Sequence, residues 1–532
     1  MSFTRQILRP ISNYFATGPD KPLLEDRKQI GRIYEKKRRL AFASIIFGYS
    51  FFYVCRGSFN VAKESMIDGG ILNAAQMGKI GFALFIAYAF GKLINGFLAD
   101  RSNIRRFMST GLLVSAVINV LFGFTDLFII FMVLWFVNGW FQSMGSAPSA
   151  VVISQWFSNR ERGTRYGLWS TAQSIGDGIT FVGTAIIVSY CGWRWGIGGA
   201  GAVTIFIAML LFRTLCDRPQ TYGLPPVADY KNDHTAESKG TQISVRQAQL
   251  EVLKNPYVWI LGLASASMYT ARYGVNSWGI LYLQEAKDYS LISAGALLGW
   301  AKIMETIGAA SSGFVSDFFF KARRNVVTLL YGTIKVLGLI ILFTGPSTHL
   351  FNLDSSYKQY LNDGKINSVL IEALENHNIV LSEGAYISCK QKDNKQIWQI
   401  KYDKWYQWLR GYDIEQFGTV LHVSAKYNLW HICGVALFGF GLGGLLVFLG
   451  GLTAIDICSK KASGAAAGLV GILSYIATAV QEWVSGSLIE AGKMTVDGRT
   501  VHDFDKAFFF WLGAAILALV LASTLWNVKA KE

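Results

Sequence analysis

The chain has 532 residues, of which 52% are hydrophobic and 16% are charged, whereas an ordinary soluble domain carries about 25% charged residues. Apolar runs of roughly 20 residues recur along the whole sequence, which is typical of a polytopic helical membrane protein. The net charge of +15 does not indicate a nucleic-acid-binding protein, because the basic residues lie between the apolar runs and form no single patch. The six cysteines show no CxxC spacing, so neither a disulfide framework nor a zinc site is predicted.

Hydropathy predicts two groups of six spans. Residues 1–39 form a basic leader that ends in EKKRR, and the first six spans occupy 40–214. A polar linker follows over 215–255, three spans over 256–344, and three more over 431–527 before a short basic tail, 528–532. The expected spans are roughly 40–64, 78–99, 106–126, 128–156, 166–190, 195–214, 256–283, 291–316, 326–344, 430–454, 464–490 and 507–527.

The loops predict the orientation of the chain. An even number of spans places both termini on one side, and the loops on that side carry the basic clusters DRSNIRR, SNRERGTR, FKARRN and SKKASG. Basic loops are typically cytoplasmic. We therefore expect a multi-pass protein of the bacterial inner membrane, with cytoplasmic leader, linker and tail.

One loop is far longer than the others. Residues 345–430 form an insertion between the ninth and tenth spans, on the extracytoplasmic side. It contains helix-like sequence (YKQYLNDGKINSVLIEALENH) and strand-like sequence (YISCK, IWQIKY), and a structureless loop of this length is uncommon. A small α+β fold is expected, in which the aromatic cluster WYQWLRGY is more consistent with a small core than with a sugar-binding platform.

A local motif occurs once in each half of the chain. GFLADRSNIRR (96–106) follows the second span, and GFVSDFFFKARR (313–324) follows the eighth. Each motif combines a small residue, an aspartate and basic residues at the end of a helix. The aspartate can pair with a basic residue or a helix end across the cytoplasmic face, and such a contact can form in one conformation and break in another. A simple topogenic basic loop is the alternative. The expected gate residues are Asp100, Arg101, Arg105, Asp317, Arg323 and Arg324.

This pattern resembles the signature loop of the major facilitator superfamily. The resemblance implies an all-α membrane fold of twelve helices in two six-helix bundles. It also implies a substrate site at their interface near the midplane, exposed alternately to each side by rocking of the bundles.

Two arginines stand inside the apolar runs. Arg56 lies in GYSFFYVCRGSFNVAK in the first span, and Arg272 lies in MYTARYGVNSW in the seventh. A charged side chain at mid-membrane costs roughly 2.5–3.5 kcal/mol on insertion scales, so each needs a function or a partner. The arginine fork matches phosphate and carboxylate, and two arginines balance a phosphate monoester dianion. An empty pair is costly, which favours exchange of one phosphate for another over uniport. A structural ion pair is the alternative.

Other polar residues inside the spans fit the same cavity. Lys92 is the third cationic candidate for phosphate, and snorkelling or pairing with an acid is its alternative role. Gln173 and Asp177 are four residues apart and share a helix face, whereas Lys302 and Glu305 are three apart and could pair locally as gate or packing partners. The remaining, weaker candidates, which could instead be packing residues, are Tyr49, Tyr53, Tyr88, Tyr475, Gln481 and Glu482.

Several segments resemble the organophosphate:phosphate antiporters, a family within the superfamily. They are GYSFFYVCRGSFNVAK, AYAFGKLINGFLADRSN, NGWFQSMG, SQWFSNRERGTRYGLWSTAQSIGDG, ARYGVNSWGILYLQE and KKASGAAAGLVGILSY. The resemblance implies that Arg56 and Arg272 hold the phosphoryl group, and it matches Lys92 to the family's span-two lysine.

The sequence also departs from the family pattern. Gly57 and Gln173 stand where glycerol-phosphate members carry lysine and histidine, which favours a hexose phosphate. Ala479 and Trp483 stand where hexose-phosphate members carry an acid and a lysine, which leaves the sugar open.

These observations predict an antiporter, not an enzyme, that exchanges an organic phosphate for inorganic phosphate. Hexose 6-phosphate, such as glucose 6-phosphate, is the expected substrate, with glycerol 3-phosphate or a phosphoglycerate as alternatives. A monomer in the lipid bilayer without cofactor or metal is expected. A receptor for external hexose phosphate that signals to a membrane kinase is a rival hypothesis. An enzyme housed in the insertion is a weak one, because His377 and Cys389 form no recognisable constellation.

Overall fold

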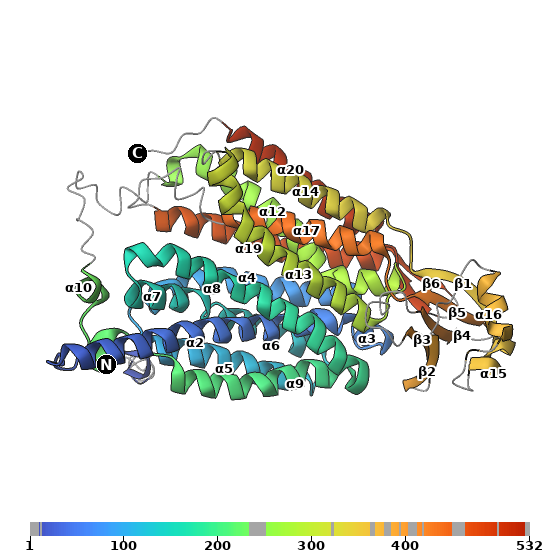
Figure 1. Cartoon of the computed structure of the whole chain (residues 1–532), viewed down its shortest axis with the longest axis horizontal. Helices are drawn as coiled ribbons and strands as arrows, with labels where there is room; N and C mark the ends of the chain where they lie inside the picture. The colour runs from blue at the N-terminus through green and yellow to red at the C-terminus, as the bar shows by residue number, and fades with distance from the viewer. Residues whose placement is uncertain are drawn as a thin grey trace.

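The computed structural model describes residues 10 and 13–526, apart from 233–251, 321–323, 362–365, 367, 377–384, 393–394, 403–411, 418–419, 450–462 and 497–498. Most of the chain is long helices that run side by side (Figure 1). Both termini lie at one end of the molecule, called the termini end here, and a small β-sheet occupies the opposite end, called the sheet end (Figure 1). The predicted aromatic cluster at 405–412 lies almost entirely outside the described residues.

The N-terminal half is built from helices that follow the expected spans. Its fourth span is broken between α6 and α7 at Ser143, whose hydroxyl donates to the carbonyl of Trp140 at 2.7 Å. The fifth and sixth spans form one continuous helical segment that turns sharply at Gly192, where φ is +81° and only glycine is unstrained. The elements are α2 (Arg27–Val61), α3 (Lys63–Asp68), α4 (Ala74–Ala99), α5 (Ile104–Phe122), α6 (Phe128–Gln142), α7 (Ser146–Trp156), α8 (Asn159–Ile179), η1 (Thr180–Thr184) and α9 (Ala185–Thr214).

Residues 27–39 of the leader are helical. Helix α2 already begins at Arg27, because the Asp26 carboxylate caps it by accepting from the Lys28 amide at 2.8 Å. Tyr34 and Arg38 are buried against the rest of the N-terminal half. The basic EKKRR stretch is therefore part of the first membrane helix. The linker contributes η2 (Pro219–Tyr222) and α10 (Val227–Lys231) to the same end of the molecule.

The C-terminal half repeats the arrangement with one long helix for each expected span. Asn255 caps the first of them, and Ser290 caps the second. The elements are α12 (Pro256–Glu285), α13 (Leu291–Phe314), η3 (Val315–Phe319), α14 (Arg324–Thr344), α17 (Leu429–Val447), α19 (Ser463–Ala491) and α20 (Asp505–Thr524).

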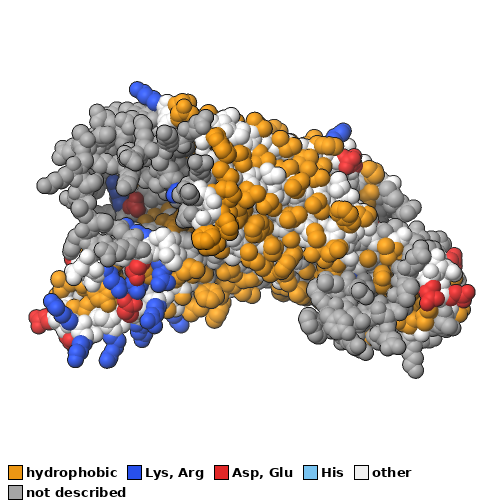
Figure 2. All heavy atoms as spheres, turned by 45° about the horizontal axis from the view of Figure 1, so that its top comes forward, with side chains coloured by type: hydrophobic (Ala, Val, Ile, Leu, Met, Phe, Trp, Pro, Cys, Tyr) orange, Lys and Arg blue, Asp and Glu red, His pale blue; other side chains and the backbone are white. Residues whose placement is uncertain are grey.

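The surface is that of a membrane protein. Among the described residues, eight helical segments are long and apolar enough to cross a bilayer. Hydrophobic side chains cover the middle of the face seen in Figure 2, and charged side chains gather toward the termini end and at the tip of the sheet end.

The segment between α14 and α17 folds as a five-stranded antiparallel sheet with the strand order β1-β5-β4-β3-β2. Trp398, Ile414 and Leu370 are buried in its own core. A second hairpin, which the sequence analysis missed, joins α19 to α20. The elements are β1 (His349–Asp354), η4 (Ser355–Tyr357), α15 (Lys358–Leu361), α16 (Ser368–Glu375), β2 (Ala385–Lys392), β3 (Lys395–Tyr402), β4 (Tyr412–Phe417), β5 (Val420–Ala425), β6 (Lys493–Val496) and β7 (Arg499–His502).

The two halves meet through α4 against α19 and α8 against α13, and glycines allow the closest approach. A Cβ at Gly78 would lie 2.5 Å from the carbonyl oxygen of Glu482, and one at Gly295 would lie 2.3 Å from that of Phe181. Both contacts lie toward the sheet end, in the second turns of α4 and α13. Toward the termini end, a Cβ at Gly167 of α8 or at Gly313 of α13 would meet no atom within 4 Å. The close contacts between the halves at these glycines are therefore at the sheet end.

Candidate functional site

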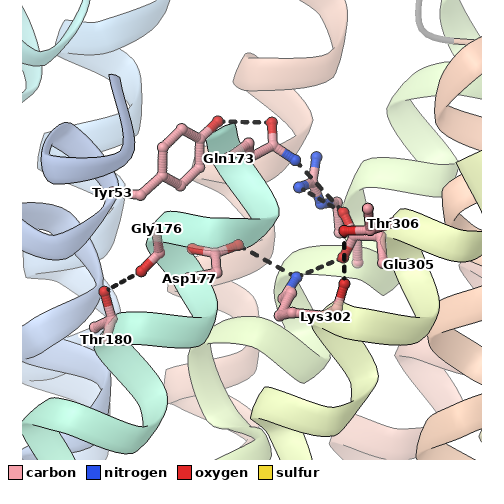
Figure 3. A network of polar contacts seen from close by, with 9 residues as sticks. Tyr53, Gln173, Gly176, Asp177, Thr180, Lys302, Glu305 and Thr306 are labelled. Carbon is pink, nitrogen blue, oxygen red and sulfur yellow. Dashed lines mark hydrogen bonds and ion pairs between the residues drawn. The ribbon is translucent and has the colours of Figure 1, made fainter. Parts of the chain in front are cut away.

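A buried chain of charges crosses the interface between α8 and α13 (Figure 3). Arg272 Nη2 lies 3.3 Å from Glu305 Oε1, and Lys302 Nζ lies 2.7 Å from Glu305 Oε2. Lys302 Nζ also lies 3.2 Å from Asp177 Oδ2, on the other half of the molecule. The sequence paired Lys302 with Glu305 locally, and the structure adds Arg272 and Asp177 to that pair. Each carboxylate therefore has a cation, and Lys302 serves both.

Gln173 links this chain to the first helix. With its amide oxygen turned toward Arg272, that oxygen contacts Nη2 and accepts from Nη1 at 3.2 Å. The amide nitrogen then donates to the Tyr53 hydroxyl at 2.7 Å. In Figure 3, Tyr53 of α2 lies on one side of the chain of charges, together with Gln173 and Asp177 of α8. Lys302 and Glu305 of α13 lie on the other side. Residues of α2, α8, α12 and α13 therefore share one polar centre.

Arg56 has a different environment from Arg272. Its guanidinium carbon lies 4.2 Å from the Tyr53 ring centroid, 5.6 Å from that of Tyr88 and 6.0 Å from that of Tyr273. Among the described residues no carboxylate pairs with Arg56, although only 7% of it is exposed. Aromatic faces stabilise a cation modestly, but they leave its hydrogen-bond donors available. Arg56 is thus a buried guanidinium placed to take an anion.

Both arginines lie close to the same aromatic ring, that of Tyr273. The Arg272 guanidinium carbon lies 5.5 Å from the same Tyr273 ring. Lys92 Nζ lies 4.8 Å from the Tyr475 ring, which is 4.5 Å from the Tyr88 ring. The arginines and Lys92 are therefore connected through a cluster of tyrosines at the interface of the halves.

The charges of this centre do not cancel. Among the described residues of this centre, the buried Arg56, Arg272 and Lys302 and the partly exposed Lys92 oppose the two carboxylates Asp177 and Glu305, which leaves an excess of two positive charges. Buried charge without a counter-charge is unfavourable. The centre is therefore complementary to a dianion.

Other predicted site residues lie at the edge of this group or apart from it. The Tyr49 ring packs edge-on against Tyr53 at 5.4 Å and stacks on Trp169 at 4.8 Å, so it lies at the edge. Gln481 is fully buried and donates to Ser485 Oγ at 2.9 Å, and that oxygen also accepts from Trp511 within the C-terminal half. Glu482 pairs with Lys63 at 3.9 Å rather than with either arginine.

Lys63 and Lys335 are buried cations that the sequence analysis did not place in the site. Lys63 Nζ donates to the Ser277 carbonyl at 2.8 Å and lies 3.5 Å from the Trp278 ring centroid. Lys335, in the middle of α14, donates to the Met268 carbonyl at 3.2 Å. An ionisable residue inside an apolar run is itself a signal of function. That signal was available for Lys335, whereas Lys63 stands next to Glu64 and was read as the end of a span.

The predicted gate residues lie at the termini end. Asp100 and Arg101 are exposed just after α4, and the Arg105 guanidinium lies 5.4 Å from the Phe212 ring. Asp317 is in η3, and Arg324 begins α14. Arg323 and the side chain of Asp317 lie outside the described residues.

Comparison with known proteins gives one consistent picture. The profile of the Major Facilitator Superfamily matches residues 45–356. The membrane sensor protein UhpC of Salmonella typhimurium is 34% identical over 329 residues, 61% of this chain and 74% of that protein. A probable hexose phosphate transport protein of Chlamydia trachomatis is 28% identical over 524 residues, 96% of this chain and 95% of that protein. The glycerol-3-phosphate transporter of Bacillus subtilis is 27% identical over 528 residues, 97% of this chain and 98% of that protein.

A solved structure shares the fold. It is a bacterial homologue of the human lysosomal transporter Spinster in an inward-facing and unoccupied conformation, with a TM-score of 0.59. The likeness covers 92% of this chain and 97% of that one. At 14% identity it shows the arrangement of the helices alone.

Proposed function

We propose that this chain, which belongs to the Major Facilitator Superfamily and within it to the organophosphate:phosphate antiporters, exchanges a hexose 6-phosphate for inorganic phosphate by alternating access. Glucose 6-phosphate is the preferred candidate among the hexose phosphates. The observation that carries the proposal is the excess of two positive charges between the halves, to which the buried Arg56, Arg272 and Lys302 and the partly exposed Lys92 contribute. A phosphate monoester dianion neutralises that excess, and no chemical step is required of the protein.

The geometry suggests how the phosphate is held. Arg56 offers donors that no described carboxylate occupies, and Arg272 offers a guanidinium that is shared with Glu305. A phosphoryl group between them would compete with Glu305 for Arg272. Glu305 can keep its shorter contact with Lys302, so it remains paired when Arg272 turns to the ligand. Lys92 and its neighbouring tyrosines complete the anion site, and Gln173 and Asp177 are placed to bind sugar hydroxyls.

The same charges favour exchange over uniport. Halves that rock with an empty site must carry the two excess positive charges through a low-dielectric interface. A bound phosphate dianion removes this penalty, so reorientation is faster with either phosphate bound than with neither.

The orientation is part of the proposal. Twelve spans are assigned to the long helices, with the termini end in the cytoplasm and both termini there. The sheet of 345–430 is then an extracytoplasmic insertion between the ninth and tenth spans, and the protein is a monomer of the bacterial inner membrane. Under this assignment the conformation described above is inward-facing, because the tight contacts between the halves at Gly78 and Gly295 close the extracytoplasmic side.

The organic part of the phosphate ester is inferred from two residues of the sequence and from the names of similar proteins. Gly57 and Gln173 replace the lysine and histidine expected of a glycerol 3-phosphate carrier, and the Chlamydia relative is named for hexose phosphate transport. The Bacillus relative is named for glycerol 3-phosphate, and a Salmonella relative, 30% identical over 318 residues, for phosphoglycerate. These esters remain the alternatives.

Sensing is the second candidate function. The UhpC relative is a membrane sensor protein and is 34% identical to this chain. The central site could bind external hexose phosphate in a receptor that signals to a membrane kinase. A receptor would bind the ligand with little flux.

The test is uptake of labelled phosphate into proteoliposomes preloaded with phosphate. Unlabelled glucose 6-phosphate, glycerol 3-phosphate and a phosphoglycerate serve as competitors, and equilibrium binding of the same ligands is measured in parallel. Exchange that glucose 6-phosphate suppresses at the lowest concentration supports the proposal. Binding of glucose 6-phosphate without exchange would replace the antiporter with the sensor. Stronger suppression by another ester would replace the substrate.

A further inference from the structure

A groove outside the central site lies between α2 and α8 near the termini end, where these two helices are neighbours (Figure 1). Its volume is about 490 Å³, and its lining includes Arg38, Arg39, Phe42, Ile46, Phe47 and Arg165. A second hollow continues it along α2, lined by Arg32, Lys36 and Leu40. None of the central arginines, carboxylates or tyrosines lines either hollow. The groove therefore needs an explanation of its own.

One basic residue of the groove is already neutralised. Arg38 is buried and pairs with Glu161 at 2.9 Å and with Glu35 at 3.1 Å. Glu35 is also 3.6 Å from Lys231. The acidic groups at this site are therefore paired with Arg38 and Lys231, and they hold α2, α8 and the linker together.

The other basic residues have no such partner. In the described part of the chain, Arg32, Lys36, Arg39 and Arg165 take part in no ion pair. The Arg165 guanidinium lies over the rings of Phe42 and Phe157, at 5.3 and 5.1 Å from their centroids. These aromatic contacts fix the position of the Arg165 charge at the wall of the groove without neutralising it. Glu35, which lines both hollows, is paired with Arg38 and Lys231, so the groove keeps an excess of positive charge from these four residues.

The groove lies where polar and apolar surfaces meet. Its basic residues belong to the first half of α2 and the second turn of α8, while Phe47, two turns further along α2, is 66% exposed. Leu40, between Arg39 and Phe47, is also exposed. A basic cluster followed along one helix face by exposed apolar side chains matches the order of groups in a phospholipid, from phosphate to acyl chain.

We propose that this groove binds one anionic phospholipid. The headgroup phosphate contacts Arg39 and Arg165, and an acyl chain lies along Phe42, Ile46 and Phe47. Arg32 and Lys36 extend the positive field beyond the phosphate, toward an anionic headgroup. The proposal goes beyond substrate exchange and uses only the assignment of α2 and α8 to the membrane. It gives the basic end of the first helix a role in positioning that helix against α8.

Native mass spectrometry of the full chain in neutral detergent tests the proposal, because a micelle lacks the surface potential of a bilayer. Phosphatidylglycerol and phosphatidylcholine with the same acyl chains are titrated separately. The variant R39Q/R165Q is compared with R27Q/K28Q, which removes two exposed charges nearer the start of α2. The single variant R39Q serves if the double variant is not monodisperse. Phosphate exchange in phosphatidylcholine vesicles verifies that each variant is folded.

The expected result is preferential binding of one phosphatidylglycerol by the wild type and by R27Q/K28Q. In R39Q/R165Q the affinity falls about 100-fold or more, as expected for the loss of two hydrogen-bonded contacts to a charged phosphate, and the preference over phosphatidylcholine disappears. Equal binding of the two lipids by the wild type would overturn the proposal, as would an equal loss in both double variants. Displacement of phosphatidylglycerol by inorganic phosphate at the same concentration would assign the groove to a soluble phosphate instead.

Discussion

Replacing Lys63 with methionine should shift the protein away from the conformation that is closed at the sheet end. Lys63 lies on α3, in the N-terminal half, and its ion-pair partner Glu482 lies on α19, in the C-terminal half. Their side chains are 1% and 3% exposed. The Lys63→Met variant leaves the Glu482 carboxylate at this interface without its cation.

The size of the effect follows from this burial. Removing one partner of a buried ion pair costs about 3–5 kcal/mol. Opening the sheet end hydrates Glu482 and removes most of that cost, so the penalty falls on the closed conformation alone. The ratio of closed to open molecules should then fall by about 10²- to 10³-fold. The double variant Lys63→Met/Glu482→Gln removes both charges and should restore most of the closed population.

Spin labels at the exposed residues Lys79, on α4, and Lys493, on β6, report the separation of the halves at the sheet end. Double electron–electron resonance on a cysteine-free background should show a longer distance in Lys63→Met than in the wild type. The double variant should return to the shorter distance. Identical distance distributions in the wild type and in Lys63→Met would refute the reasoning, and so would equal opening in the single and double variants.

Three further predictions concern the interface, the central charges and the sheet. Gly78→Val and Gly295→Val should block closure at the sheet end, because a Cβ would lie 2.5 and 2.3 Å from backbone oxygens of the other half. The rate at which a thiol reagent labels cysteines introduced at this end should rise. Gly199→Val is the control, because its Cβ would meet open space, and it should leave the labelling rate unchanged. Glu305→Gln should tighten phosphate binding about tenfold while slowing exchange, because Arg272 loses the carboxylate that competes with the ligand. Calorimetry and vesicle exchange measure the two effects, and weaker binding would contradict the proposed competition. Trp398→Ala should destabilise the sheet by about 3–5 kcal/mol and make it sensitive to protease. Phosphate exchange measured on the same preparation should change little. A large loss of phosphate exchange would instead show that the sheet takes part in the transport cycle.

The positions of the long helices could be predicted from the sequence because they depend on local composition. A described helix overlaps each segment that was expected to span the membrane, since the length of an apolar run is enough to predict one. The local pair of Lys302 with Glu305 could be foreseen for the same reason, because residues three apart share a helix face. Arg56 and Arg272 stood out because charge inside an apolar run is rare.

Contacts between distant helices could not be read in this way. Nothing in the sequence near Asp177 indicates that its partner is Lys302, and nothing near Glu482 indicates Lys63. These pairs depend on how the two halves face one another, which no periodic pattern encodes. The β6–β7 hairpin was missed because each of its strands has only four residues, too few for alternation to stand out.

The most direct test of the central claim compares phosphate exchange in Arg56→Lys, Arg272→Lys and Arg194→Lys. The third arginine is a matched control, because it lies outside the site and pairs with Asp126 at 2.6 Å on the surface. Lysine keeps the charge but loses the planar fork that binds phosphate through two hydrogen bonds. We expect both site variants to lose about 10- to 100-fold in exchange rate at low phosphate, and Arg194→Lys to match the wild type. Wild-type exchange in both site variants would show that the two arginines are structural and that the anion is bound elsewhere.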